Sequence, residues 1–117
     1  MLFSLKRIVI DPLLSGDSIY FKADLYINGQ RAGLACNDGQ GSATTIDGFD
    51  KKGWELIMEA EMFCRTLPPI TIHELIVNGA PLTIRISPAY YVDKIISWLL
   101  ADQEAAIGNL VLNLTKN

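Results

Sequence analysis

Two Asn-Gly dipeptides, at residues 28–29 and 78–79, constrain the fold of this chain more than any other feature. A type I′ turn needs positive φ at both central residues, so Asn-Gly between two β-rich runs is the strongest short hairpin signal. Residues 18–27 alternate apolar and polar side chains with a period of two, which is typical of a strand with one buried face. The sequence therefore predicts two antiparallel hairpins.

The residues that follow the first turn are consistent with this prediction. With a regular two-residue turn, one face of the hairpin carries three apolar pairs: Leu25–Ala32, Ala23–Leu34 and Phe21–Cys36. The opposite face then pairs Tyr26 with Arg31 and Asp24 with Gly33. In the second hairpin the same rule places Pro81 opposite Ile76, where a missing N–H is tolerated near a sheet edge.

Two amphipathic helices complete the expected fold. Residues 51–67 carry apolar side chains at helical spacing, with Asp50 as the N-cap and a Pro-Pro pair after the last residue. Ser87 and Pro88 are typical of a second helix start. We expect an α+β domain over residues 1–117: an antiparallel sheet of about five strands, built from the two hairpins, with both helices packed on one face. Residues 109–117 fit either a last strand or more helix.

Composition argues against several classes of protein. The formal net charge is −3 and the ten Lys and Arg residues are scattered, which argues against general nucleic-acid binding. No apolar run approaches the ~20 residues that a membrane-spanning helix needs. Cys36 and Cys64 form no C-x-x-C pair, and the N-terminus lacks the order of charges of a secretory signal. We therefore expect a cytoplasmic protein with two free thiols.

A glycine-rich stretch, residues 37–48, is the best sequence candidate for a ligand site. Glycine loops and helix N-termini present backbone N–H groups to anions, and two lysines follow at the helix start. Its spacing matches neither a P-loop nor a dinucleotide fingerprint. Asp38 and Asp47 in the stretch, and Asp50 just after it, would repel phosphate unless they cap the backbone or bind a cation. A purely structural loop and a metal site are the alternatives. The candidate ligand-binding residues are Arg31, Asn37, Asp38, Gly39, Gly41, Ser42, Thr44, Lys51 and Lys52.

Catalysis is not predicted. His73, the single histidine, has no metal-ligand spacing to the cysteines or acids. Cys64 lies in an apolar helix stripe, where a thiol is inert. Glu55, Glu59 and Glu61 fit a solvated helix face. We therefore expect no enzymatic activity, no cofactor and no metal.

Aromatic side chains on the second helix indicate a contact surface. Trp98 lies off the apolar stripe of that helix, and Tyr90 and Tyr91 precede it. Tryptophan and tyrosine commonly anchor interfaces, so these three residues are the candidate interface. A second layer of the core is the alternative explanation.

One part of the chain resembles other sequences. Residues 21–33 and the following Asn37-Asp38-Gly39-Gln40-Gly41 are similar to short, uncharacterised proteins of bacteria, phages and mobile elements. This resemblance implies a small, non-catalytic binding protein that sequesters a ligand or inhibits a host protein. Taken with the residues, it favours a homo-oligomer that binds a small anionic or nucleotide-like ligand. A protein-interaction module without a small-molecule ligand is the alternative.

Overall fold

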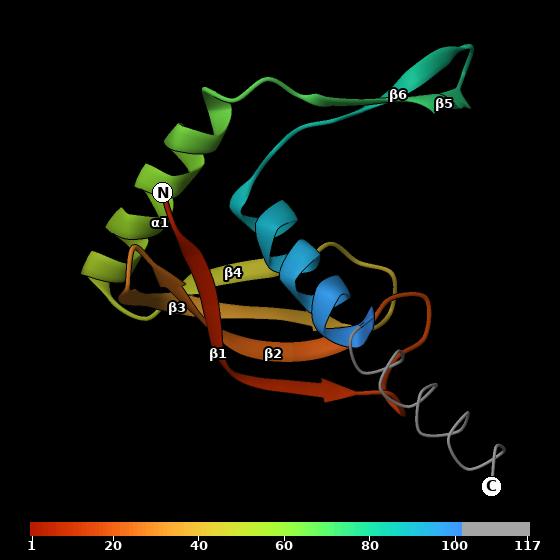
Figure 1. Ribbon diagram of the computed structural model, residues 1–117. Coiled ribbons are helices and arrows are strands. Elements are labelled where there is room, and N and C mark those ends of the chain that lie inside the picture. The colour runs from red at the N-terminus through yellow and green to blue at the C-terminus, as the bar shows by residue number, and fades with distance from the viewer. Residues whose placement is uncertain (102–117) are drawn as a thin grey trace, which may run out of the picture.

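A computed structural model describes residues 1–101 of the chain (Figure 1). One antiparallel sheet holds β1 (Phe3–Asp11), β2 (Tyr20–Ile27), β3 (Gln30–Asp38) and β4 (Thr45–Gly48), in that spatial order. Helix α1 (Lys51–Arg65) follows, then a separate hairpin of β5 (Ile70–Val77) and β6 (Ala80–Ile84), and a second helix over residues 88–101. The predicted α+β class is confirmed. The alternatives for residues 109–117 lie outside the described residues.

Both predicted Asn-Gly turns are present. Asn28 and Gly29 have φ values of 52° and 79°, and Asn78 and Gly79 have values of 52° and 82°. Positive φ at both central positions is the type I′ requirement, which glycine meets without strain and asparagine tolerates. The local turn chemistry therefore places both hairpins where the sequence predicts them.

The register of the first hairpin differs from the prediction by one residue. Past Tyr26–Arg31, which pair as expected, β3 carries one extra residue, Ala32, so that Leu25 pairs with Gly33. A Cβ on Gly33 would lie 2.3 Å from the Asp47 carbonyl oxygen of β4, so only glycine permits this close approach. The bulge exchanges the two faces of β3. The observed pairs are therefore Leu25–Gly33, Ala23–Ala35 and Phe21–Asn37.

Both helices cover the same face of the sheet. Alternate residues of β2, from Phe21 to Ile27, point toward this face and are almost fully buried. Helix α1 contributes Leu56, Ile57 and Ala60 to the core, and the second helix contributes Val92 and Ile96. Capping sets the start of each helix: Asp50 Oδ1 accepts from Gly53 N at 2.7 Å, and Ser87 Oγ accepts from Tyr90 N at 3.1 Å.

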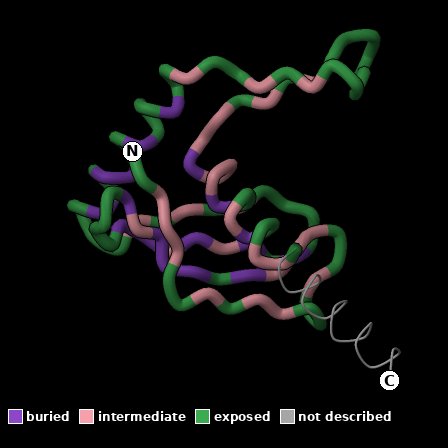
Figure 2. Tube along the Cα trace, viewed as in Figure 1, coloured by how far each residue is buried: buried purple, intermediate pink, exposed green. Residues whose placement is uncertain are grey.

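The β5–β6 hairpin, residues 70–84, stands apart from the sheet, and we call it the arm. Its strands pair with each other and with no strand of the four-stranded sheet. It projects beyond both helices, and most of its residues are exposed (Figures 1 and 2). Pro81 faces Ile76, as predicted. Within residues 1–101, no helix is long and apolar enough to cross a membrane.

Candidate functional site

The buried side chain of Asn37 organises the glycine-rich loop. Its Oδ1 accepts hydrogen bonds from Ser18 Oγ at 2.7 Å and from Gly39 N at 2.9 Å. Its Nδ2 donates to the Ser42 carbonyl at 2.9 Å and to Thr44 Oγ1 at 3.3 Å. The side chain reaches this position because the bulge in β3 turns Asn37 toward the helix-covered face. Its polar atoms close the loop and are not directed at a ligand.

Three backbone N–H groups of the loop are bonded within the protein. Gly39 N donates to Asn37, Gln40 N donates to Asp38 Oδ1 at 2.9 Å, and Gly41 N donates to Ser18 Oγ at 3.0 Å. An anion cradle needs N–H groups that point outward without a partner. These three N–H groups are therefore not available to a phosphate, and Asp38 caps the backbone.

The two glycines of the loop, Gly39 and Gly41, allow it to lie in close contact with residues 12–18. Gly39 and Gly41 have φ values of 78° and 89°. A Cβ on Gly39 would lie 2.5 Å from the Leu14 carbonyl oxygen, and the Gly39 carbonyl accepts from Gly16 N at 2.9 Å. Positive φ and backbone contact both require glycine here. These glycines hold two loops together at one end of the sheet.

The predicted ligand residues do not form one cluster. Strand β4 leads away from the loop, so that Lys51 and Lys52 begin α1 near the opposite end of β3, where Phe49 N donates to the Ala32 carbonyl. Arg31 is at that same end. Its guanidinium lies 3.4 Å from Asp24 Oδ2 and 3.9 Å from the centre of the Phe49 ring. The basic residues are therefore separated from the loop that they were expected to assist.

A cavity of about 390 Å³ lies beside the loop, against the second helix. Of the predicted residues it includes Asn37, Ser42 and Thr44. Asp93 was not predicted, and its Oδ1 accepts a 2.5 Å hydrogen bond from Thr44 Oγ1. The remaining lining residues that sequence reasoning missed are Asp17, Ser18, Ile19, Phe21, Ala43, Ile96 and Ser97. Asp93 and Ser97 lie one helical turn apart, a spacing that could have indicated a polar face.

The lining of this loop cavity favours cations or polyhydroxylated molecules. Two carboxylates, from Asp17 and Asp93, are present with several hydroxyl groups, and none of the basic side chains within residues 1–101 lines the cavity. Such a lining repels phosphate. Within the described part of the chain, no three His, Cys, Asp or Glu side chains are grouped as a metal site.

The predicted interface residues lie together on the second helix. The Tyr91 ring stacks on Phe3 with centroids 4.9 Å apart, and Tyr90 meets Tyr91 edge-on at 5.6 Å. Trp98 is 62% exposed, which places it outside the core. A groove of about 200 Å³, which we call the Trp98 groove, is lined by Met1, Phe3, Tyr91, Lys94, Ile95 and Trp98.

Among residues 1–101, the histidine and the cysteines form no catalytic pair. Cys64 is buried in α1, and burial, with a smaller effect of the Glu61 carboxylate, raises the pKa of its thiol above the ordinary value of 9.0. Cys36 lies on the other face of the sheet, 3.2 Å from Thr45 Oγ1. His73 is exposed on the arm. A protonated buried thiol is a poor nucleophile.

The resemblance to proteins of mobile elements stays a prediction, because none of the three comparisons tests it. No protein-family model, no curated protein and no solved structure matches the chain.

Proposed function

We propose that this protein is a non-catalytic interaction module that associates with a second copy of itself through the arm. The observation that carries the proposal is the arm: a two-stranded hairpin that leaves the domain body and exposes apolar side chains. Leu75, Ile76 and Val77, beside its turn, are 47%, 58% and 46% exposed. Apolar side chains gathered at the tip of a projecting element are typical of a contact surface.

The arm has little support of its own. An isolated two-stranded hairpin is marginally stable in water, and its two free edges can accept further strands. Its ladder is also interrupted, because the pairing passes from Ile72–Leu82 directly to Ile76–Pro81. Residues 73–75 therefore have no partner on β6. Docking on another surface would supply the contacts that the hairpin lacks.

The Trp98 groove is the surface that matches the arm in charge. Glu74 is the one residue of the arm with a formal charge at neutral pH, and it is exposed next to the apolar tip. Among the residues that the structure describes, Lys94 is the one charged side chain of the groove, and the other lining residues are apolar or aromatic. Opposite charges beside matched apolar surfaces favour one orientation of docking. We therefore place Glu74 of one copy against Lys94 of its partner.

A second copy is the partner that this pairing requires. Each chain carries both the arm and the groove, so two chains can exchange arms. A reciprocal exchange of this kind closes as a two-fold dimer, the commonest symmetry of soluble oligomers. The dimer would bury two arm tips and both Trp98 side chains.

Light scattering during gel filtration tests the proposal, with the protein at about 100 µM. The wild type is expected to be a dimer. Glu74→Lys and Lys94→Glu should each weaken association at least tenfold, since a like-charge pair at an interface costs more than about 1.4 kcal/mol. The double charge swap should restore it. Lys52→Glu, an equal change at an exposed position of α1, is the control and should leave the dimer intact.

The swap separates docking from folding. Circular dichroism should show the same helix content in all four variants. A wild type that is a strict monomer would overturn the proposal. Dimerisation that survives both single reversals, or two single losses that the swap fails to rescue, would also contradict the Glu74–Lys94 contact.

Ligand binding beside the glycine-rich loop is the second candidate function, supported by the volume of the loop cavity. Its Asp17 and Asp93 carboxylates favour amines or polyols over the anionic ligand expected from sequence. Thermal-shift measurements with a nucleotide panel, a polyamine and a set of sugars would distinguish these classes. Stabilisation by nucleotides with no response to polyamines or sugars would contradict this chemistry.

A further inference from the structure

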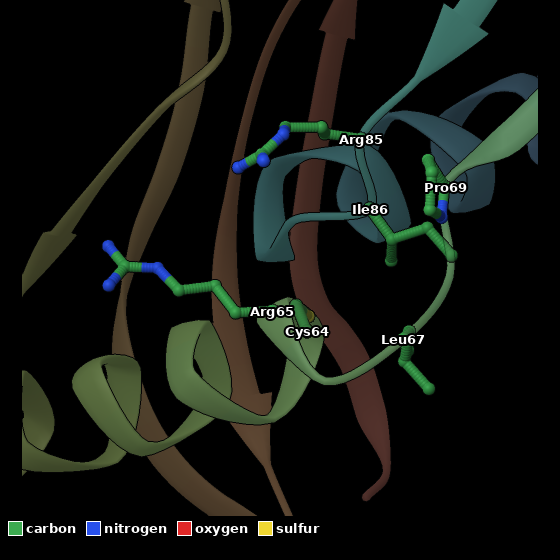
Figure 3. A pocket seen from close by; sticks show the side chains of 6 residues that line it. All are labelled: Cys64, Arg65, Leu67, Pro69, Arg85 and Ile86. Carbon is green, nitrogen blue, oxygen red and sulfur yellow. The ribbon is translucent and has the colours of Figure 1, made fainter.

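Two neighbouring cavities lie at the base of the arm, where α1 ends and the second helix begins. Their volumes are about 140 Å³ and about 260 Å³, and both are lined by Arg65, Arg85 and Ile86. We treat them as one arm-base cleft. Figure 3 shows the two guanidinium groups extending in the same direction, while Leu67 and Pro69 lie on the other side.

Folding brings the two arginines together from opposite sides of the arm. Arg65 is the last residue of α1, and Arg85 directly follows β6. The chain leaves the body after the first arginine and returns at the second, so closure of the arm hairpin places both on one cleft.

Neither arginine has an acidic partner among residues 1–101. The one ion pair within 4.0 Å in that range joins Arg31 and Asp24. The side-chain hydrogen bonds of the same range also involve neither Arg65 nor Arg85. Each guanidinium keeps five N–H donors in a planar fork, the geometry that binds carboxylate and phosphate oxygens in pairs.

The charge of the cleft is opposite to that of the protein. Its lining carries two arginines and one acid, Glu61, whereas the whole chain has a formal net charge of −3. The positive end of the second helix also faces the cleft, through Ser87 and Pro88. The negative end of α1 is partly satisfied, since Thr66 N and Leu67 N donate to the last carbonyls. The local field therefore favours an anion.

We infer that the arm-base cleft binds a small organic oxyanion, a carboxylate or a phosphate ester carried on a compact apolar body. Arg65 and Arg85 contact the oxyanion. Leu67, Pro69 and Ile86 contact the apolar body, since they line the smaller cavity next to the arginines. The inference is independent of self-association: it concerns a ligand of one chain, and its site includes neither Glu74 nor Lys94.

Phenyl phosphate, benzoate and neutral benzyl alcohol are the probes for this site. In ¹⁵N–¹H spectra at 0.1 M NaCl, we expect phenyl phosphate, benzoate or both to shift the amides of residues 65, 85 and 86 saturably. Arg65→Gln and Arg85→Gln should each weaken binding at least tenfold, because each removes charge-assisted hydrogen bonds. Arg7→Gln, an equal change at an exposed arginine of β1, should leave it unchanged.

The outcomes are distinct. A response to phenyl phosphate alone identifies a phosphate site, and an equal response to benzoate identifies a general oxyanion site. The inference is overturned if neither anion causes saturable shifts, or if benzyl alcohol binds as well as they do. Binding that persists in Arg85→Gln, with the rest of the spectrum unchanged, would also overturn it.

Discussion

Gly53→Ala in the first turn of α1 has two opposing effects on stability: it improves helix propensity, and it crowds a close contact with the sheet. Alanine ordinarily stabilises a helix by ~0.5–1 kcal/mol relative to glycine. Here the added Cβ would lie 2.0 Å from the carbonyl oxygen of Ala32, the bulge residue of β3. That oxygen cannot easily move aside, because it accepts a hydrogen bond from Phe49 N at 3.1 Å.

The steric cost decides whether Gly53→Ala raises or lowers the free energy of unfolding. Relieving the contact requires a shift of roughly 1 Å between α1 and β3, and a gap of that size forfeits a quarter to a half of the dispersion energy of the atoms involved. The packed side chains affected are Leu56, Ile57 and Ala60. Overpacking typically costs ~1–3 kcal/mol, so the net loss of stability should be ~1–2 kcal/mol. For a domain of this size the Tm then falls by at least about 4 °C.

Thermal and urea unfolding measured by circular dichroism check this prediction. Glu59→Ala, on the exposed face of the same helix, is the matched control and should stay within about 0.5 kcal/mol of the wild type. A Gly53→Ala protein that is more stable than the wild type would refute the reasoning. It would mean that α1 does not approach β3 as closely as the bulge implies.

Three further predictions concern Asn37 and the thiols. Asn37→Ala removes four side-chain hydrogen bonds and should cost ~2–3 kcal/mol in urea unfolding. Asn37→Asp keeps the acceptor but places a carboxylate oxygen against the Ser42 carbonyl oxygen, so it should also destabilise the protein. An Asp variant as stable as the wild type would contradict the bonding pattern. Burial raises the pKa of Cys64 in the folded state, so the neutral thiol contributes its full stabilisation below pH 9.0. This contribution is lost as the pH rises through the folded-state pKa, with a slope of at most ~1.4 kcal/mol per pH unit. Cys64→Ala should flatten this decline. In native protein a thiol reagent should modify Cys36 well before Cys64, and equal rates would contradict the burial of Cys64.

Local signals were sufficient for much of the fold. The Asn-Gly turns, the Asp50 and Ser87 caps and the helical periodicity of α1 act over a few residues, so each could be recognised without knowing its neighbours in space. The Ile76–Pro81 pair follows from the turn alone. The exposed position of Trp98 was one of the two alternatives that its place off the apolar stripe left open, and the structure decides between them.

The candidate site was less predictable because its contacts are not local. Sequence proximity placed Lys51, Lys52 and the glycine-rich loop together, whereas β4 carries the chain between them to the other end of the sheet. Asp93 joins the loop cavity from 49 residues beyond Thr44. Arg65 and Arg85 meet only because the arm closes on itself.

The amino-acid sequence therefore determined which segments form turns, strands or helices, since those preferences come from backbone sterics and short-range hydrogen bonds. Tertiary contacts decided which face each strand presents. Gly33 has no Cβ, so β4 can approach it closely beside a bulge at Ala32, and that single extra residue turns Asn37 into the core face. The glycine-rich loop is thereby closed by hydrogen bonds within the protein, while the arm has no place in the four-stranded sheet and keeps its apolar side chains exposed.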